Sequence, residues 1–342
     1  MSSVSRRHFL MAAFGAGSAA ALGWIPSLRA DNLTPKPAAN AGTLQFARRA
    51  GFALGSEVSM LALHASKEHA AEALEAAFAE LETVEAVMSI YRRESQLSIL
   101  NRTGVLNHPH PYLVSVLRTA QETAERSGGA FDVTVQPLWE LYTNAKKADR
   151  LPSRDEIESA RAKVDWRKLS VSKDRITLKS PGMAVTLNGI AQGFAADCAV
   201  TALKARGVTH ALLNSGEIAA LGKKASNDPW TVGIQHPRRE DAYAGLAKLD
   251  GLCLSTSGDY QTTFSNDFLY NHIFDPATGR SPTAFSSVSI AATSGTLADA
   301  LSTAVFVLGP ERRAQLLKEC NASGFFIMKD GTTLKTADFP LS

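Results

Sequence analysis

The chain has 342 residues, of which 45% are hydrophobic and 20% are charged. These ordinary globular values exclude a disordered chain and a collagen-like repeat, and 3 cysteines are too few for a disulfide scaffold. Because 36 Lys and Arg against 33 Asp and Glu give a formal net charge of +3, the location of the excess decides whether an anionic partner is expected.

The excess positive charge lies in residues 1–30, which contain Arg6, Arg7 and Arg29 and no acidic residue. The paired arginines precede a weakly hydrophobic run from Met11 to Trp24, and Leu28-Arg29-Ala30 follows as a small-residue cleavage site. This layout predicts a twin-arginine export signal over residues 1–30 and a periplasmic location. Removal of the signal leaves 33 basic and 33 acidic residues, so no nucleic-acid partner is expected.

An uncleaved membrane anchor is the alternative interpretation of this segment. Its apolar run is short and rich in Gly and Ala for a span of ~20 residues, so we expect cleavage and no stable membrane insertion of the mature protein. Residues 31–43 are rich in Pro, Asn and Ala, which is typical of a linker. The rest, 44–342, is expected to form one domain, in which Cys198, Cys253 and Cys320 are buried as small hydrophobic residues.

Hydrophobic periodicity predicts the following elements in chain order. We expect a strand from Phe52 to Leu63, an amphipathic helix from Lys67 to Met88 with Ser66 as its N-cap, and a helix from Pro111 to Ser127 that ends at Gly128-Gly129. Strands are expected at 169–171, 176–178, 184–187, 211–214, 230–235, 246–254 and 288–292, and further helices at 191–206 and 297–308. Because strands and helices alternate without a strict βαβ period, the predicted fold class is α+β or mixed.

Several polar segments could form a ligand site. The segment Asn188-Gly189-Ile190-Ala191-Gln192-Gly193 joins an expected strand to an expected helix, and free N–H groups at a helix N-terminus can bind a phosphate. Its alternative is a tight turn without a ligand. Short segments at 129–134, 214–217 and 255–260 each combine small residues with a carboxylate, as loops around a ligand do, although each could also be a simple turn.

Two further segments offer catalytic chemistry. His272 and Asp275 share a loop that is suited to acid–base work, but Asp275 could instead cap the Pro-Ala-Thr-Gly turn and His272 could be a core histidine. Asp299 and Thr303 are four residues apart on one helix face and offer oxygen ligands to Mg²⁺. Their alternative is a structural role at the start of the helix.

The set and the order of these motifs resemble the ApbE family of FAD:protein FMN transferases. The series begins with Ser89-Ile90-Tyr91 and residues 95–101, and continues with GAFDVTV, LNGIAQG, NSGEI, TSGDY, HIFDPATG and ADALSTA. The resemblance extends from about residue 51 to residue 309. It implies an α+β fold related to the T-fold, in which mixed sheets pack with helices and a ligand cleft lies between lobes.

The resemblance also implies an activity and its residues. Family members bind FAD and Mg²⁺ and transfer FMN to a threonine hydroxyl of a target flavoprotein, with release of AMP. His272 matches the acid–base histidine, and Asp299 is likewise expected to take part in catalysis. The Mg²⁺ positions correspond to Gly189, through its carbonyl, and to Asp299, Ser302 and Thr303. The FAD positions correspond to Tyr91, Ala130, Phe131, Asp132, Thr186, Gln192 and Val288.

The third motif departs from the common family pattern. Thr186, Asn188 and Gln192 replace the usual Asp, Gly and Lys, so a carboxylate and an ammonium beside the flavin are lost together; Leu54 replaces a frequent Met. The LNGIAQG motif, Gly216-Glu217-Ile218 and the export signal resemble the NosX-like branch, whose acceptor is a NosR-like membrane flavoprotein of nitrous oxide reduction. An FAD pyrophosphatase that yields FMN and AMP, and a non-catalytic flavin-binding carrier, are the alternative functions.

Overall fold

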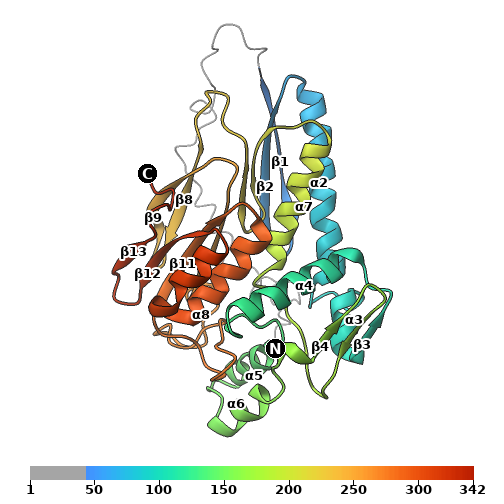
Figure 1. Ribbon diagram of the computed structural model, residues 1–342, viewed down its shortest axis with the longest axis vertical. Coiled ribbons are helices and arrows are strands. Elements are labelled where there is room, and N and C mark those ends of the chain that lie inside the picture. Colours follow the sequence, from blue (N-terminus) through green and yellow to red (C-terminus); the bar gives the residue numbers. More distant parts are fainter. Residues whose placement is uncertain (1–43) are drawn as a thin grey trace, which may run out of the picture.

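An eight-stranded antiparallel sheet is the main scaffold of this computed structural model, which describes residues 44–342 (Figure 1). The predicted export signal and linker lie outside the described residues. The order of the strands in the sheet is β1-β2-β6-β7-β10-β11-β12-β13. They are β1 (Gln45–Ala53), β2 (Ser56–His64), β6 (His210–Asn214), β7 (Ile218–Leu221), β10 (Cys253–Gly258), β11 (Phe285–Ala292), β12 (Ser323–Met328) and β13 (Thr333–Lys335).

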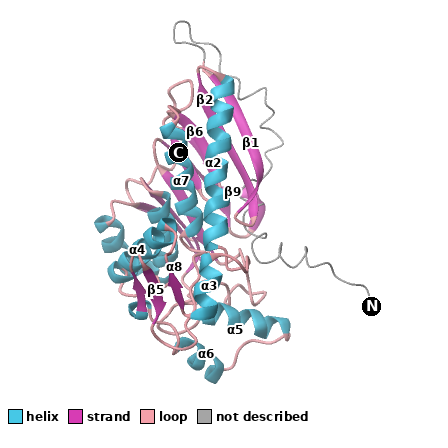
Figure 2. Ribbon diagram, turned by 90° about the vertical axis from the view of Figure 1, so that its right-hand side faces the viewer, coloured by secondary structure: helices cyan, strands magenta, loops and turns pink. Residues whose placement is uncertain are grey.

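Three helices pack on one face of this sheet: α2 (Lys67–Met88), α7 (Ala191–Ala205) and α8 (Gly295–Glu319) (Figures 1 and 2). The α2 helix begins where the Ser66 side chain accepts a hydrogen bond from the His69 N–H, and its buried residues recur at helical spacing. The α8 helix is kinked at Gly309, which has a positive φ and precedes Pro310. The helices and the sheet enclose the largest hydrophobic core of the described residues.

A hairpin of β8 (Trp230–His236) and β9 (Arg239–Leu249) packs against the other face of the sheet. Its Trp230, Val232 and Leu249 form a second core with residues that alternate along the main strands. In β11, Ile290 belongs to the first core and Ala291 to the second. The centre of the sheet is therefore covered on both faces, and every residue of β11 is buried.

A smaller lobe of short helices and strands occupies the lower part of both views (Figures 1 and 2). Its three-stranded sheet has the order β3-β5-β4. A third core joins α5 and α6 to Phe274, which lies on the long loop between β10 and β11. The elements of this lobe are α3 (Gln96–Thr103), β3 (Val105–Asn107), α4 (Pro111–Arg126), α5 (Gln136–Lys147), α6 (Arg154–Arg161), the 3₁₀-helix η2 (Trp166–Lys168), β4 (Leu169–Val171) and β5 (Arg175–Leu178).

The predicted α+β class is confirmed, as are the helices that begin at Lys67 and Pro111. Three predicted strands need correction. The run 52–63 contains the β1–β2 turn, where Leu54 and Gly55 have positive φ. The run 246–254 is divided by a turn into β9 and β10, and 184–187 has a single bridge, from Ala184 to Val135, in place of a strand. The first error arises because the apolar residues Ala53 and Leu54 continue into the tight turn. The second turn does carry a sequence signal, since Asp250-Gly251, a dipeptide typical of turns, interrupts the apolar run.

All three cysteines were expected to be buried, and two of them are. Cys253 and Cys320 are buried, whereas Cys198 is half-buried, and all three are free thiols. Within residues 44–342, no helix combines the length and the apolar character that crossing a bilayer requires.

Candidate active site

A cavity of about 220 Å³, the main cavity, lies where the N-terminal ends of α7 and α8 meet β7, β8 and β10. It brings together the polar segments that the sequence singled out. Its walls include residues 130–133, Thr186, Asn188, Gly189, Gln192, residues 216–218, residues 256–258, residues 272–274, Asp299 and Thr303. Segments that are far apart in the sequence therefore share one concave surface, which is typical of a binding site.

Gly189, Asp299 and Thr303 meet on one side of the main cavity. A Cβ atom on Gly189 would fall 2.8 Å from Thr303 Oγ1, so the glycine lets the backbone approach that hydroxyl. Asp299 is buried and accepts a hydrogen bond of 2.9 Å from the Gly193 N–H at the start of α7. Ser302 does not line the cavity, because its hydroxyl is buried in bonds to Ser257 Oγ at 2.7 Å and to the Asp299 carbonyl at 2.8 Å.

The position of Asp299 depends on a residue that the sequence analysis did not select. The Asp197 carboxylate accepts hydrogen bonds from the Gly295 and Thr296 N–H groups and from the Ser294 hydroxyl, at 2.7 to 2.9 Å. Asp197 on α7 thus holds the N-terminus of α8, where free N–H groups favour a carboxylate. The sequence carries no signal for this role, because Asp197 and Gly295 are far apart along the chain.

A second buried carboxyl group, Glu217, lies beside Asp299. Glu217 lines the main cavity, and its Oε2 accepts a hydrogen bond of 3.2 Å from the Thr256 N–H. Burial raises the pKa of Asp299 to about 7, and burial followed by repulsion from Asp299 raises the pKa of Glu217 well above its usual range. With the Thr303 and Ser257 hydroxyls, which are 3.1 Å apart, these groups form the kind of oxygen-rich set that hard divalent cations prefer.

His272 lies on the β10–β11 loop and lines the main cavity. Its Nδ1 is 3.3 Å from the Thr262 carbonyl oxygen, and its backbone N–H donates to the same oxygen at 3.0 Å. Because a carbonyl oxygen only accepts, this contact assigns the ring proton to Nδ1 and leaves Nε2 with a free lone pair. Burial lowers the pKa of His272 to about 4, so the imidazole is neutral at pH 7.

The segment 130–133 and Thr186 form the wall next to the smaller lobe. Asp132 is buried and accepts hydrogen bonds from the Thr134 N–H at 2.7 Å and from the Trp166 N–H at 3.1 Å. The Thr186 N–H donates to the Val133 carbonyl at 2.8 Å. Asp132 therefore fixes the shape of this wall, and Ala130 and Phe131 lie beside it on the cavity surface.

An apolar cavity of about 410 Å³ adjoins the main cavity, and Asn188 and Gln192 line both. Its walls include Tyr91 and Leu54. The Gln192 side chain packs on Gly216, which has a φ of 99° and where a Cβ atom would fall 2.6 Å from Gln192 Cδ. Tyr91 and Gln192, two residues expected to contact FAD, thus lie along one continuous surface.

One sequence expectation, for Val288, meets a different arrangement. The Val288 side chain is fully buried in β11 and lines neither cavity; its cross-strand partner Ser257 lines the main cavity instead. Periodicity could not predict this, because β11 is covered on both faces. Asp275 caps its own turn, as the alternative interpretation held, since its Oδ1 accepts a hydrogen bond of 2.9 Å from the Ala277 N–H.

Comparison with known proteins identifies a matching family and several relatives. The ApbE family model matches residues 54–326. The FAD:protein FMN transferase of Treponema pallidum is 34% identical over 293 residues, which are 78% of this chain and 80% of that protein. The enzyme of the same name from Escherichia coli K12 is 28% identical over 283 residues, with 79% and 80% covered.

Solved structures share the fold. The flavinyl transferase ApbE of Pseudomonas stutzeri has a TM-score of 0.75 at 29% identity, and the match covers 86% of this chain and 95% of that one. The ApbE protein of Thermotoga maritima has a TM-score of 0.77 at 27% identity, with 86% and 97% covered.

Proposed function

The chain belongs to the ApbE family and is an FAD:protein FMN transferase, and we propose that it requires Mg²⁺ and transfers FMN to a threonine hydroxyl of its acceptor. One observation carries the proposal: a neutral histidine with a free ring nitrogen lines the same cavity as a buried carboxyl pair. The histidine can take a proton from a hydroxyl nucleophile, and the carboxyl pair can hold a cation beside a pyrophosphate.

The donor set fits a divalent cation. Asp299, Thr303 and the Gly189 backbone would hold Mg²⁺, and Glu217 adds a second carboxyl group beside them. When bound, the ion would supply positive charge to the pyrophosphate of FAD. Because burial raises the pKa of Asp299 to about 7, the cavity disfavours the charged carboxylate, and the group would give up its proton when a cation binds.

Hydroxyl and backbone oxygens are needed in this donor set. Among residues 44–342, no group of three or more His, Cys, Asp and Glu side chains is arranged to hold a metal ion. The two carboxyl groups are therefore completed by Thr303 and the Gly189 backbone, and a hard cation such as Mg²⁺ accepts such oxygen ligands together with water and substrate phosphates.

Residues of the chain account for the proton transfer. His272 Nε2 accepts the proton of the threonine hydroxyl as the threonine oxygen forms a bond to the FMN phosphorus. The bond between that phosphorus and the AMP oxygen breaks, and AMP leaves with the electron pair, in line with the attacking oxygen. The Thr262 carbonyl keeps the imidazole in the tautomer that this step needs.

We further propose a periplasmic enzyme of the NosX-like branch whose acceptor is a NosR-like membrane flavoprotein. The predicted export signal in residues 1–30, the LNGIAQG motif and Gly216-Glu217-Ile218 support this assignment. The body of the chain has equal numbers of basic and acidic residues after removal of residues 1–30. Recognition of the anionic substrate therefore depends on the local groups of the main cavity.

The test is an incubation of residues 31–342 with FAD, Mg²⁺ and an acceptor flavoprotein domain that carries the threonine. We expect a fluorescent acceptor band in a denaturing gel and one AMP released per flavin attached. An acceptor with valine in place of the threonine is the control and should stay dark. The absence of both the band and AMP would overturn the proposal.

Two other outcomes identify the alternative functions. Release of FMN and AMP at the same rate with and without acceptor would indicate an FAD pyrophosphatase, in which water replaces the threonine. Tight binding of FAD that stays intact over a long incubation would indicate a carrier, which the loss of the family Asp and Lys at Thr186 and Gln192 would then explain.

A further inference from the structure

A cluster of three charged residues lies next to the main cavity. Asp259 follows β10 between two cavity-lining residues, Gly258 and Tyr260, and its own side chain is fully buried. Arg238 Nη1 and Nη2 donate to its two carboxylate oxygens at 2.7 Å each, and Lys329 Nζ donates to Oδ2 at 2.5 Å. Because Arg238 belongs to the turn between β8 and β9 and Lys329 follows β12, the cluster joins three segments that are distant in the sequence.

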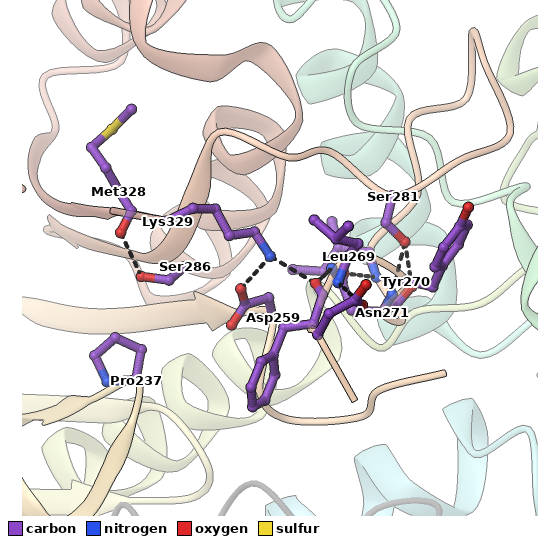
Figure 3. A network of polar contacts seen from close by, with 12 residues as sticks. Pro237, Asp259, Leu269, Tyr270, Asn271, Ser281, Ser286, Met328 and Lys329 are labelled. Atoms are coloured by element: carbon purple, nitrogen blue, oxygen red, sulfur yellow. Dashed lines mark hydrogen bonds and ion pairs between the residues drawn. The ribbon is translucent and has the colours of Figure 1, made fainter. Parts of the chain in front are cut away.

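Lys329 also contacts the loop that carries His272. Its Nζ donates a second hydrogen bond, of 2.7 Å, to the Phe268 carbonyl oxygen. Figure 3 shows the Lys329 ammonium between Asp259 and the loop residues Leu269, Tyr270 and Asn271. The Lys329 side chain is only 19% exposed, so this bridge is shielded from most of the solvent. Buried Asp259 thereby becomes a fixed point to which the loop tip is attached.

The loop tip needs such an attachment because Phe268 is strained. Its φ is 60°, a conformation in which a bulky side chain is a rare outlier. Asn271 Nδ2 donates to the Phe268 carbonyl at 3.3 Å, and the Arg238 guanidinium lies 4.1 Å from the centre of the Phe268 ring. Strained residues persist where their surroundings hold them firmly, and they gather at functional sites.

The two arms of the loop connect its tip to His272. Thr263 and Asn271 form a bridge, and the Phe264 N–H donates to the Tyr270 carbonyl at 2.7 Å. The next residues on each arm are Thr262 and His272, where the Thr262 carbonyl accepts from both the backbone N–H and Nδ1 of His272. A shift of one arm along the other would therefore separate the imidazole from the carbonyl that orients it.

We propose that Lys329 is a positioning residue for His272. By joining the Phe268 carbonyl to Asp259, Lys329 fixes the register of the two loop arms and so keeps the Thr262 carbonyl on Nδ1 of the imidazole. This inference rests on the proposed function, in which His272 is the base. Lys329 itself lines neither cavity, so it acts on the site through its contacts with Asp259 and the loop.

The test compares Lys329→Met with the unchanged protein. Methionine keeps an unbranched apolar stem, and Arg238 still satisfies both oxygens of Asp259, so the fold is expected to persist. We expect kcat for FMN transfer to fall roughly 10- to 100-fold, as for a catalytic group displaced by about 1 Å, while KM for FAD changes less than about threefold. Amide hydrogen exchange should accelerate in residues 263–272 and stay unchanged in β10 and β11. Lys329→Arg should restore part of kcat.

The control is Lys335→Met, which removes an exposed lysine on β13 and should change neither kcat nor exchange in the loop. Exchange in residues 263–272 is measured without substrate, so it tests the positioning role independently of catalysis. If the unchanged protein transferred no FMN, that result would refute the proposed function alone. Unchanged exchange in the loop, or an unchanged kcat in an active enzyme, would overturn the inference. If circular dichroism shows that Lys329→Met does not fold, Lys329→Gln, whose amide is too short to bridge both partners, takes its place with the same expectations.

Discussion

His272 and Asp299 line one cavity, yet burial moves their pKa values in opposite directions from their usual values. The pKa of His272 falls to about 4 and that of Asp299 rises to about 7, because burial disfavours the charged form of each group. The histidine is therefore an unprotonated base at neutral pH, and the aspartate is an acid that a cation can ionise. The sequence predicts which residues these are, but the shifts follow from burial, which composition does not reveal.

The role of His272 leads to a prediction for His272→Asn. Asparagine can still donate to the Thr262 carbonyl, but it cannot accept a proton at neutral pH. We expect transfer to slow ~10²-fold or more, the usual scale for loss of a general base, while FAD binding persists. AMP release and quenching of flavin fluorescence measure the two quantities. His108→Asn, at an exposed histidine, is the matched control, and equal rates in the two variants would remove His272 from the mechanism.

The raised pKa of Asp299 predicts that Mg²⁺ binding depends on pH. The carboxyl group must lose its proton to bind a cation, so below its pKa of about 7 protons compete with the metal. We expect the affinity for Mg²⁺ to weaken as the pH falls from 7 to 5, by up to ~10-fold per unit, and to level off above pH 8. Calorimetry in buffers of different ionisation heat should detect proton release at pH 6.5. Asp299→Asn should abolish Mg²⁺ binding; an affinity that is equal at pH 6 and pH 8 would contradict the assignment.

Elements with a strong local sequence signal were predictable, whereas elements defined by contacts with distant segments were not. The α2 helix follows from its N-cap Ser66 and an apolar stripe. The β1–β2 turn was missed because Leu54 occupies a left-handed position that glycine or asparagine normally takes. In the structure, a contact with a distant segment holds this turn: the Leu54 N–H donates to Glu85 Oε2 of α2 at 3.0 Å. No local pattern contains that contact.

The crossing of α7 and α8 gives a prediction at the scale of elements. A Cβ atom on Gly193 would overlap the Gly295 carbonyl and fall 2.7 Å from Asp299 Cβ, so Gly193→Ala must push the two helix starts apart. We expect a loss of ~2 to 3 kcal/mol in the free energy of unfolding, as for an overpacked core, together with loss of Mg²⁺ binding. Urea unfolding measures the first quantity.

Gly245→Ala is the matched control for this variant. Its Cβ would meet the end of the flexible Leu341 side chain, which can move aside at small cost. Equal free energies of unfolding for the two variants would show that the helix crossing is not tightly packed.

At the scale of the whole molecule, the site lies where separate layers meet. The main cavity is built from helices α7 and α8, the hairpin β8–β9 and residues 130–133 beside the smaller lobe. The sequence predicted the polar segments as possible ligand loops, and their family resemblance predicted that they converge. The sequence could not predict Asp197 or Lys329 as supporting residues. Each acts through a contact between distant segments, which only strand pairing and helix packing bring together.

The charge of the whole chain leads to the last prediction. The entire formal excess of +3 comes from Arg6, Arg7 and Arg29, so we interpret it as part of an export signal. Arg6→Lys with Arg7→Lys keeps the charge but removes both guanidinium groups, whose planar donors lysine cannot reproduce. We expect the doubly substituted precursor to accumulate in the cytoplasm as a folded, FAD-binding protein, since residues 44–342 contain the whole candidate site. Cell fractionation with immunoblotting measures this, and Arg48→Lys with Arg49→Lys, an adjacent arginine pair in β1, should leave export intact. Periplasmic protein at the normal level from the Arg6 and Arg7 variant would refute the twin-arginine assignment.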